Sequence, residues 1–169
     1  EGMKSELHRR GCLSIRHLLA RAGYTDADLY YDQAGKPHLK DGTFISITHS
    51  FEFTGIILSK KQEVGIDIEK QRDKILRLAH RFTPVREYRT FANDQALIRK
   101  LTMVWGAKES IYKIMGIHGL SFLNHIRVAE FDMEHGHTSA EVFIKGTSGR
   151  FEIFFREFEG FTLAYALSV

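Results

Sequence analysis

Four apolar segments, separated by short turn sequences, occupy the last third of the chain and constrain its fold more than any other feature. They are Ile126–Phe131, Ser139–Ile144, Phe151–Phe155 and Phe161–Leu167. Each has the length and the β-branched or aromatic content of a strand, and glycine occurs in each intervening turn. Because such short connections join neighbouring antiparallel strands, these segments predict an antiparallel meander.

The N-terminal part of the chain contains one helical pattern and three strand-like segments. Apolar residues at helical spacing predict a helix over residues 4–22, which ends at Gly23. A turn-rich stretch follows from Asp32 to Gly42. The strand-like segments are Phe44–Thr48, Thr54–Ser59 and Val64–Glu69. The last of them alternates apolar and polar residues with a period of two, which predicts a strand with one polar face.

Helices are predicted for the middle of the chain. An apolar stripe from Ile75 to Phe82 predicts one helix, and Thr83-Pro84 resembles an N-cap followed by proline at the first position of another. A longer helix is predicted from Asp94 to Met115, with Gly116 ending it. The side chains expected to face the core are those of Leu97, Leu101, Val104, Trp105, Ile111 and Met115. The order of helix, strands, helices and strands predicts an α+β protein, and two similar halves are compatible with it.

The composition is that of a globular domain. The 169 residues fit one domain of ordinary size, or two small halves that share a core. Cys12 is the single cysteine, which excludes an intrachain disulfide framework. No apolar run approaches the roughly 18 residues of a membrane span, and the N-terminus lacks the apolar region of a signal peptide. We therefore expect a soluble, cytoplasmic protein.

Positive charge is concentrated in one stretch. The net charge of the whole chain is +3, but residues 70–113 carry 11 basic and 4 acidic side chains. Such a stretch suits a polyanion, which includes nucleic acid, a phosphorylated ligand and an acidic protein. A solvent-exposed helical face explains the same charge without any partner.

Two carboxylates lie close together on the strand that ends at Glu69. Strand alternation places Asp67 and Glu69 on one face, roughly 7 Å apart at their Cα atoms. Carboxylate pairs of this kind are typical Mg²⁺ ligands, because Mg²⁺ takes few protein carboxylates and keeps its other positions for water and phosphate. A solvent-facing strand end with polar residues is the alternative.

Glu109 and Lys113 stand four residues apart on the long predicted helix and therefore share a face. This spacing is common in surface salt bridges. Trp105 lies one turn earlier on the same stripe, so the pair is expected at the edge of the buried surface. There, a carboxylate could complete a metal site and the lysine could bind a phosphate.

A third group of polar residues includes Thr48 and His49, shortly after Lys36 in the chain. A hydroxyl, an imidazole and a lysine could together bind phosphate, although a histidine at a strand end is also common for structural reasons. Other histidine pairs lack the ligand set of a zinc site. No Walker, GxGxxG, HExxH or GxSxG motif occurs.

Four of these segments resemble one enzyme family. They are Gly35-Lys36-Pro37-His38, Ser46-Ile47-Thr48-His49-Ser50, Val64-Gly65-Ile66-Asp67-Ile68-Glu69-Lys70 and Trp105-Gly106-Ala107-Lys108-Glu109-Ser110-Ile111-Tyr112-Lys113. Their order and approximate spacing are similar to those of the 4′-phosphopantetheinyl transferases of the surfactin-synthetase-activating type. Each motif is weak alone, but four in order over residues 35–113 are specific.

The resemblance implies a fold and an activity. It implies an α+β pseudo-dimer of two similar halves with mainly antiparallel sheets, here about residues 1–63 and 64–169 of a single domain. It implies an enzyme of the holo-[acyl-carrier-protein] synthase type, as used in fatty acid biosynthesis. Such an enzyme transfers 4′-phosphopantetheine from coenzyme A to a serine of an apo acyl or peptidyl carrier protein, and releases adenosine 3′,5′-bisphosphate. A monomer is expected.

The resemblance also implies roles for individual residues. Asp67, Glu69 and Glu109 correspond to the Mg²⁺ ligands, and Lys113 corresponds to a lysine that binds the pyrophosphate and handles protons. We expect Glu109 to accept the serine proton, directly or through a metal-bound water. The residues that correspond to coenzyme A contacts are Lys36, Thr48 and His49, with Arg16 as a further 3′-phosphate ligand by a looser alignment.

The sequence departs from the family pattern in two places. Thr48 stands where the family commonly has serine, and threonine retains the hydroxyl group. The stretch that usually precedes the first helix is reduced to Glu1-Gly2-Met3. We therefore expect either a truncated N-terminus or a shorter subfamily.

Two other functional classes remain as alternatives. One is a catalytically silent homologue that binds coenzyme A or a carrier protein, although the intact set of acidic residues argues against it. The other is a nucleic-acid-binding domain, which the absence of a reader motif disfavours. On the transferase reading, the basic stretch predicts a docking surface for an acidic carrier protein. Its candidate residues are Arg72, Lys74, Arg86 and Arg89.

Overall fold

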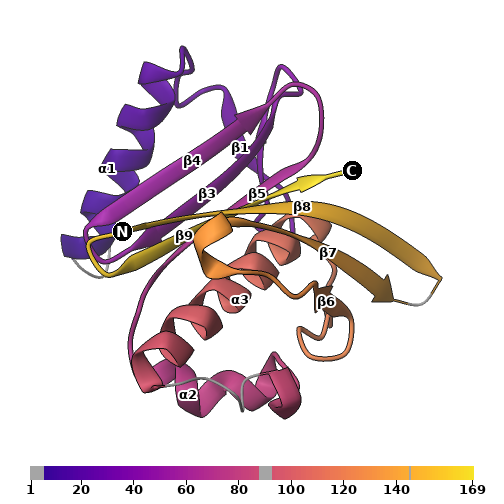
Figure 1. Cartoon of the computed structure of the whole chain (residues 1–169). Coiled ribbons are helices and arrows are strands. Elements are labelled where there is room, and N and C mark those ends of the chain that lie inside the picture. Colours follow the sequence, from indigo (N-terminus) through magenta and orange to yellow (C-terminus); the bar gives the residue numbers. More distant parts are fainter. Residues whose placement is uncertain (1–5, 88–92, 145) are drawn as a thin grey trace.

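The predicted antiparallel meander forms the largest sheet of the molecule. The computed structural model describes residues 6–87, 93–144 and 146–169, and Figure 1 shows their arrangement. The four meander strands are β6 (Ile126–Val128), β7 (His137–Ile144), β8 (Thr147–Phe158) and β9 (Phe161–Ser168). A fifth strand, β5 (Val64–Lys70), pairs antiparallel with β9, so the sheet order is β5-β9-β8-β7-β6.

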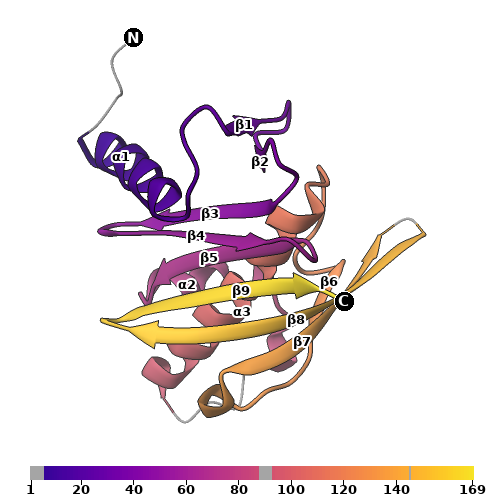
Figure 2. The same cartoon turned by 90° about the horizontal axis from the view of Figure 1, so that it is seen from above.

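One long helix covers a face of this sheet. Helix α3 (Asp94–Met115) packs on β5 and β9, as Figures 1 and 2 show. Its bounds match the prediction, because the Asn93 side chain caps its first turn and Gly116 ends it in the left-handed conformation. The short helix α2 (Lys74–Leu78) and the 3₁₀ turns η1 (Ala79–Arg81) and η2 (Val85–Glu87) connect β5 to α3.

Small residues allow α3 to approach the sheet closely. A Cβ at Gly65 of β5 would lie 1.9 Å from the backbone oxygen of Ser110 on α3. A Cβ at Gly106 would lie 3.0 Å from the Cβ of Ala164 on β9. The Ser110 hydroxyl donates to the Ala164 carbonyl at 3.0 Å and thereby links the helix to the sheet. The face of β5 that was predicted to be polar is therefore covered by α3.

The N-terminal part has its own small core. Helix α1 (Glu6–Arg21) packs against a hairpin of β3 (Phe44–Ser50) and β4 (Phe53–Ser59). A second hairpin is formed by β1 (Leu29–Tyr31), which precedes the stretch that was predicted to be turns, and β2 (Pro37–Leu39), which lies within it. The buried apolar cluster of this part consists of Leu19, Leu39 and Ile45, whereas the larger clusters lie around α3.

Side-chain hydroxyls join the two parts along β5. The backbone N–H of Ile66 donates to the Ser46 hydroxyl at 3.2 Å, and that of Ile68 donates to the Thr48 hydroxyl at 3.0 Å. Ser46 and Thr48 are two apart on β3, so their side chains leave the same face of that strand. They occupy the places that backbone carbonyls would take in a continuous sheet.

The predicted α+β class is confirmed by this mixture of helices and antiparallel sheets. Equivalence of the halves at about 1–63 and 64–169 stays a prediction. Two local predictions differ from the structure: the helix expected after Thr83-Pro84 is only the 3₁₀ turn η2 where described, and β6 ends at Val128. A third 3₁₀ turn, η3 (Met133–His135), precedes β7. Among the described helices, none combines the length and hydrophobicity that a membrane crossing requires.

Candidate active site

Asp67 and Lys113 form a buried ion pair where β5 meets α3. The Asp67 side chain is 9% exposed, and its Oδ1 lies 2.9 Å from the Lys113 Nζ. Lys113 also donates to the Ile66 carbonyl at 2.7 Å. The Thr48 hydroxyl lies 3.5 Å from Asp67 Oδ1, at the long limit of a hydrogen bond. Burial raises the pKa of Asp67, and the charge of Lys113 opposes that effect.

The second oxygen of Asp67 has no hydrogen-bond partner among the described residues, although it is buried. A buried carboxylate oxygen without a partner is costly, and such atoms commonly mark a site that a ligand completes. The position that a Cβ would take at Gly106 is 3.9 Å from this oxygen. Glycine at this position therefore adds no side chain next to this oxygen.

Two further carboxylates share the negative field of Asp67. Burial and repulsion from Asp67 raise the pKa of Glu109 to about 7, with Lys113 opposing the increase. Burial and the same repulsion raise the pKa of Glu69, which the Arg72 charge and a hydrogen bond from Trp105 oppose. Three carboxylates thus lie near one lysine, an excess of negative charge that a cation would neutralise.

The donor chemistry of this cluster fits a hard divalent cation. Carboxylate oxygens are the ligands that Mg²⁺ prefers, and the unpartnered Asp67 oxygen is available to one. Within the described residues, no three acidic, histidine or cysteine side chains are already placed as a complete metal site. The chemistry of a metal site is therefore present, while its side chains are not gathered into a coordination shell.

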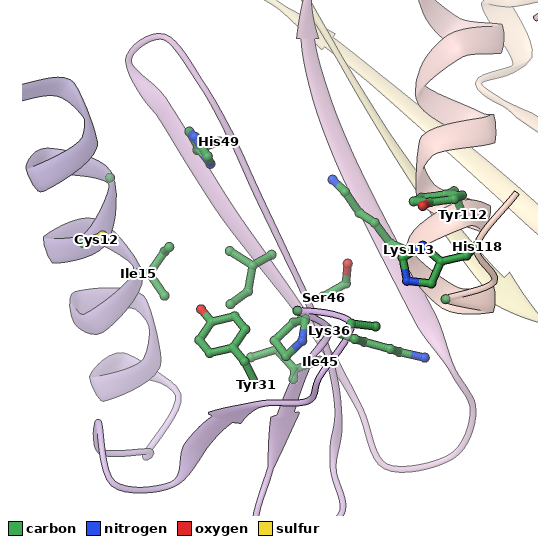
Figure 3. A pocket seen from close by; sticks show the side chains of 16 residues that line it. Cys12, Ile15, Tyr31, Lys36, Ile45, Ser46, His49, Tyr112, Lys113 and His118 are labelled. Atoms are coloured by element: carbon green, nitrogen blue, oxygen red, sulfur yellow. The ribbon is translucent and has the colours of Figure 1, made fainter. Parts of the chain in front are cut away.

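A cavity of about 390 Å³ opens beside this cluster, between the two parts of the molecule. Figure 3 shows Cys12 and Ile15 of α1 on one side of it and Tyr112, Lys113 and His118 on the other. Residues of β3 and of the turn before β2 complete the wall. Lys113 touches both the cavity and Asp67, so it connects the two features.

Comparison with known proteins agrees with this geometry. The family model of the 4′-phosphopantetheinyl transferase superfamily matches residues 63–166. The chain belongs to this superfamily. The matched region runs from the start of β5 almost to the end of β9, and so contains Asp67, Glu69, Glu109 and Lys113.

A curated relative supports the assignment to the transferase superfamily. The chain is 29% identical over 116 residues to the 4′-phosphopantetheinyl transferase AcpT of Salmonella typhi. The alignment covers 65% of this chain and 60% of that relative.

The four residues predicted to contact coenzyme A do not all line this cavity. His49 and Lys36 both line it. The Lys36 ammonium, however, donates to the Ile114 carbonyl at 2.6 Å and pairs with Glu63 at 3.1 Å. Lys36 therefore ties the turn before β2 to the end of α3, and its aliphatic stem contributes to the wall.

Two of the predicted coenzyme A ligands lie away from the lining. Thr48 is buried against β5, where its hydroxyl accepts from Ile68 and lies near Asp67. Arg16 is exposed on α1 and pairs with Asp26 at 3.1 Å. The phosphate-binding roles of Thr48 and Arg16 stay predictions.

Some residues of this candidate site were not singled out from the sequence. Gly106 and Ser46 shape it through close packing and through a hydroxyl bond to β5. The Ser-x-Thr alternation on β3 could have indicated the hydroxyl pair, because strand spacing matches alternate N–H groups of a neighbouring strand. The role of Gly106 depends on contact with a strand more than fifty residues away and leaves no local signal.

The hydroxyl seam, by which we mean the bonds from the β5 N–H groups to the Ser46 and Thr48 hydroxyls, can be tested by replacing Thr48. A Thr48→Val variant leaves the buried N–H of Ile68 without an acceptor, which should lower the free energy of unfolding by about 1–3 kcal/mol. Thr48→Ser keeps the hydroxyl and should cost about 1 kcal/mol or less for the lost methyl group. Chemical denaturation measures both, and wild-type stability of Thr48→Val would show that the hydroxyl bond contributes nothing.

Proposed function

We propose that this protein transfers 4′-phosphopantetheine from coenzyme A to a serine of an apo acyl or peptidyl carrier protein, in an Mg²⁺-dependent reaction. One observation carries the proposal: the buried, unpartnered oxygen of Asp67 lies beside Glu109 and Lys113, next to a cavity of about 390 Å³. Family membership supports the reaction class. The holo-[acyl-carrier-protein] synthase subtype is part of the proposal.

Asp67, Glu69 and Glu109 are the residues that would hold Mg²⁺ in this proposal. Bound there, the ion would neutralise charge on the pyrophosphate and on the departing adenosine 3′,5′-bisphosphate. Lys113 places a second positive charge at the same location. Its ammonium is already fixed by Asp67 and by the Ile66 carbonyl, so little reorganisation is needed when an anion binds.

The chemistry asked of the protein is proton removal and alignment. The serine oxygen forms a bond to the phosphorus that carries pantetheine. The bond between that phosphorus and the bridging oxygen of the pyrophosphate breaks, and this oxygen leaves with adenosine 3′,5′-bisphosphate. The serine proton passes to Glu109. In the metal-free protein the pKa of Glu109 is raised to about 7 by burial and by repulsion from Asp67, and a bound cation, which offsets that repulsion, would favour the deprotonated form that accepts a proton.

The cavity beside Lys113 is the proposed coenzyme A site. Its walls are mostly apolar, which suits an adenine ring, and His49, which lines it, is the proposed contact to the 3′-phosphate. Lys36 reaches the phosphates only by giving up its bonds to Glu63 and Ile114. We therefore assign Lys36 mainly to the shape of the site, with Arg16 and Thr48 as lesser candidates.

A direct assay distinguishes the transferase from a silent homologue. Protein, coenzyme A, Mg²⁺ and a panel of apo carrier proteins are mixed, and intact mass spectrometry records addition of one phosphopantetheine group to the carrier serine. A serine-to-alanine carrier is the matched control. Coenzyme A binding without any transfer, across fatty-acid, polyketide and nonribosomal peptide carriers, would overturn the proposal and favour a silent binding homologue.

The exposed surface of the segment that connects β5 to α3 in the chain is the proposed docking site for the carrier protein. Arg72, Lys74 and Arg86 are exposed there, and among the described residues none of the three forms an ion pair. Arg89, the fourth predicted contact, lies outside the described residues. A second cavity of about 150 Å³, lined by residues that include Glu69 and Lys74, opens on this surface. An acidic carrier bound here would bring its serine toward the carboxylates.

Charge reversal tests this surface. Lys74→Glu and Arg86→Glu should each raise the KM for the carrier on the order of tenfold at low salt, because they repel an acidic partner. The KM for coenzyme A should stay unchanged. Arg156→Glu, on the exposed side of β8, is the matched control. Equal effects on both substrates would place carrier docking elsewhere.

A further inference from the structure

Lys108 is a buried lysine that the proposed chemistry does not use. Its side chain is 2% exposed on α3, directly before Glu109. The ammonium donates to three backbone carbonyls, at 2.5 Å to Phe82, 2.7 Å to Phe122 and 2.7 Å to Ile126. Among the described residues no carboxylate forms an ion pair with it. Its three donors are matched by three acceptors from separate segments.

Two of these segments carry the aromatic rings that enclose Trp105. The Phe82 ring contacts the indole edge-on with centroids 5.2 Å apart, and the Phe122 ring contacts it at 5.3 Å. Phe82 follows η1, and Phe122 lies in the connection between α3 and β6. Within the residues that the structure describes, no backbone hydrogen bond joins the Phe82 or the Phe122 segment to α3, and the Lys108 ammonium binds both segments to the helix that bears Trp105.

Trp105 in turn contacts a residue of the active site. Both Trp105 and Glu69 line the smaller cavity, and the indole lies near enough to the Glu69 carboxylate to lower the pKa of that group. The indole that neighbours Glu69 therefore packs against two phenylalanine rings. The backbone carbonyls of both phenylalanines accept hydrogen bonds from the Lys108 ammonium.

We propose that Lys108 is a positioning residue: by binding the carbonyls of Phe82 and Phe122 it fixes the Trp105 ring, and through it the carboxylate of Glu69. The proposal rests on the proposed function, in which Glu69 is a metal ligand. Residues behind metal ligands commonly alter metal affinity strongly when they are replaced.

Fluorescence tests the first half of this proposal without any assay of activity. Trp105 is the single tryptophan of the chain, so all indole emission reports its surroundings. Lys108→Met removes the three donors while keeping an unbranched side chain that ends at Cε, one atom short of lysine. The Trp105 emission of this variant should shift to longer wavelength, and acrylamide should quench it more strongly than in the wild type. Val142→Ala is the control, because Val142 is fully buried on β7 and belongs to another core cluster than Trp105.

Metal dependence tests the second half. The Mg²⁺ concentration for half-maximal transfer should rise about 10- to 100-fold in Lys108→Met, while the KM for coenzyme A is unchanged. An Mg²⁺ titration followed by Trp105 emission should show the same weakening without any carrier. If the wild-type protein transfers nothing to any carrier, the proposed function fails, and the two emission experiments still decide the role of Lys108.

A second variant covers the case in which Lys108→Met does not fold. Lys108→Arg keeps the charge but presents its donors in a planar fork, which cannot match three carbonyls arranged around an ammonium. It should show a smaller shift in emission and an intermediate Mg²⁺ requirement. Wild-type emission and wild-type Mg²⁺ requirement in a folded variant would overturn the proposal and leave Lys108 with a purely structural role.

Discussion

A Glu109→Gln variant should lose about two to four orders of magnitude in transfer rate, because glutamine cannot accept the serine proton. The same variant should be more stable than the wild type at pH 8 in the absence of Mg²⁺. Both effects have one cause. The cluster of Asp67, Glu69 and Glu109 concentrates negative charge in a poorly hydrated place, which suits a cation but opposes folding without one.

The sign of the stability effect follows from the pKa of Glu109. Its value in the folded protein is about 7, above the ordinary value of 4.5, so the folded state binds more protons between these two values. The free energy of unfolding therefore falls as pH rises from about 4.5 to 7, and stays lowered above that. Removing the charge should restore on the order of 2 kcal/mol at pH 8 and nothing at pH 4.

Three measurements check this prediction. Single-turnover transfer gives the rate, thermal unfolding at several pH values gives the stability, and added Mg²⁺ should raise the melting temperature of the wild type more than that of the variant. Glu52→Gln, which removes an exposed carboxylate in the turn between β3 and β4, is the control and should change none of them. Full transfer rate in Glu109→Gln would exclude Glu109 as the proton acceptor.

A Gly65→Ala variant should not reach the native fold. The added Cβ would lie 1.9 Å from the Ser110 carbonyl oxygen and 2.8 Å from its carbon, so α3 would have to move off the sheet. Backbone atoms cannot yield as a flexible side chain does, and the loss should exceed about 3 kcal/mol, a large part of the stability of an ordinary domain.

Gly55→Ala is a matched control for this prediction. Gly55 also lies within a strand, but a Cβ there meets its nearest neighbour, a Thr48 methyl group, at an ordinary 3.4 Å. Urea denaturation and soluble yield compare the two variants. A native-like Gly65→Ala protein would mean that α3 can sit further from β5 than the structure places it.

The helix α3 was predictable because local residues determine its ends. Asn93 accepts the N–H of Ala96 at 2.9 Å, and Gly116 adopts a positive φ of 59°. The β1–β2 hairpin was missed, because strands of three residues are too short to show a periodic pattern. The motifs identified Asp67 and Glu109 as candidates, whereas the burial of Asp67 depends on α3 approaching over Gly65, a contact distant in the chain.

For the basic stretch, too, the sequence predicted only part of what the structure shows, because the partners of its charged side chains lie far away in the chain. Its charge was evident from the sequence, but the structure uses the basic residues of α3 internally. Arg99 binds Glu134 and Glu157, Lys108 binds carbonyls, and Lys113 binds Asp67. The exposed share of the charge lies before α3, around Lys74 and Arg86. This exposed share is the part that the proposed carrier protein would contact.

The seam between β3 and β5 consists of side chains where a continuous sheet would have backbone. Backbone ladders form with almost any sequence, but the bonds from Ser46 and Thr48 exist only while those positions bear hydroxyls. The cavity beside Lys113 has walls from both sides of this seam. Its width is therefore a property that one or two point mutations can adjust. Substrate fit in such a molecule can change in small steps, without any alteration of either sheet.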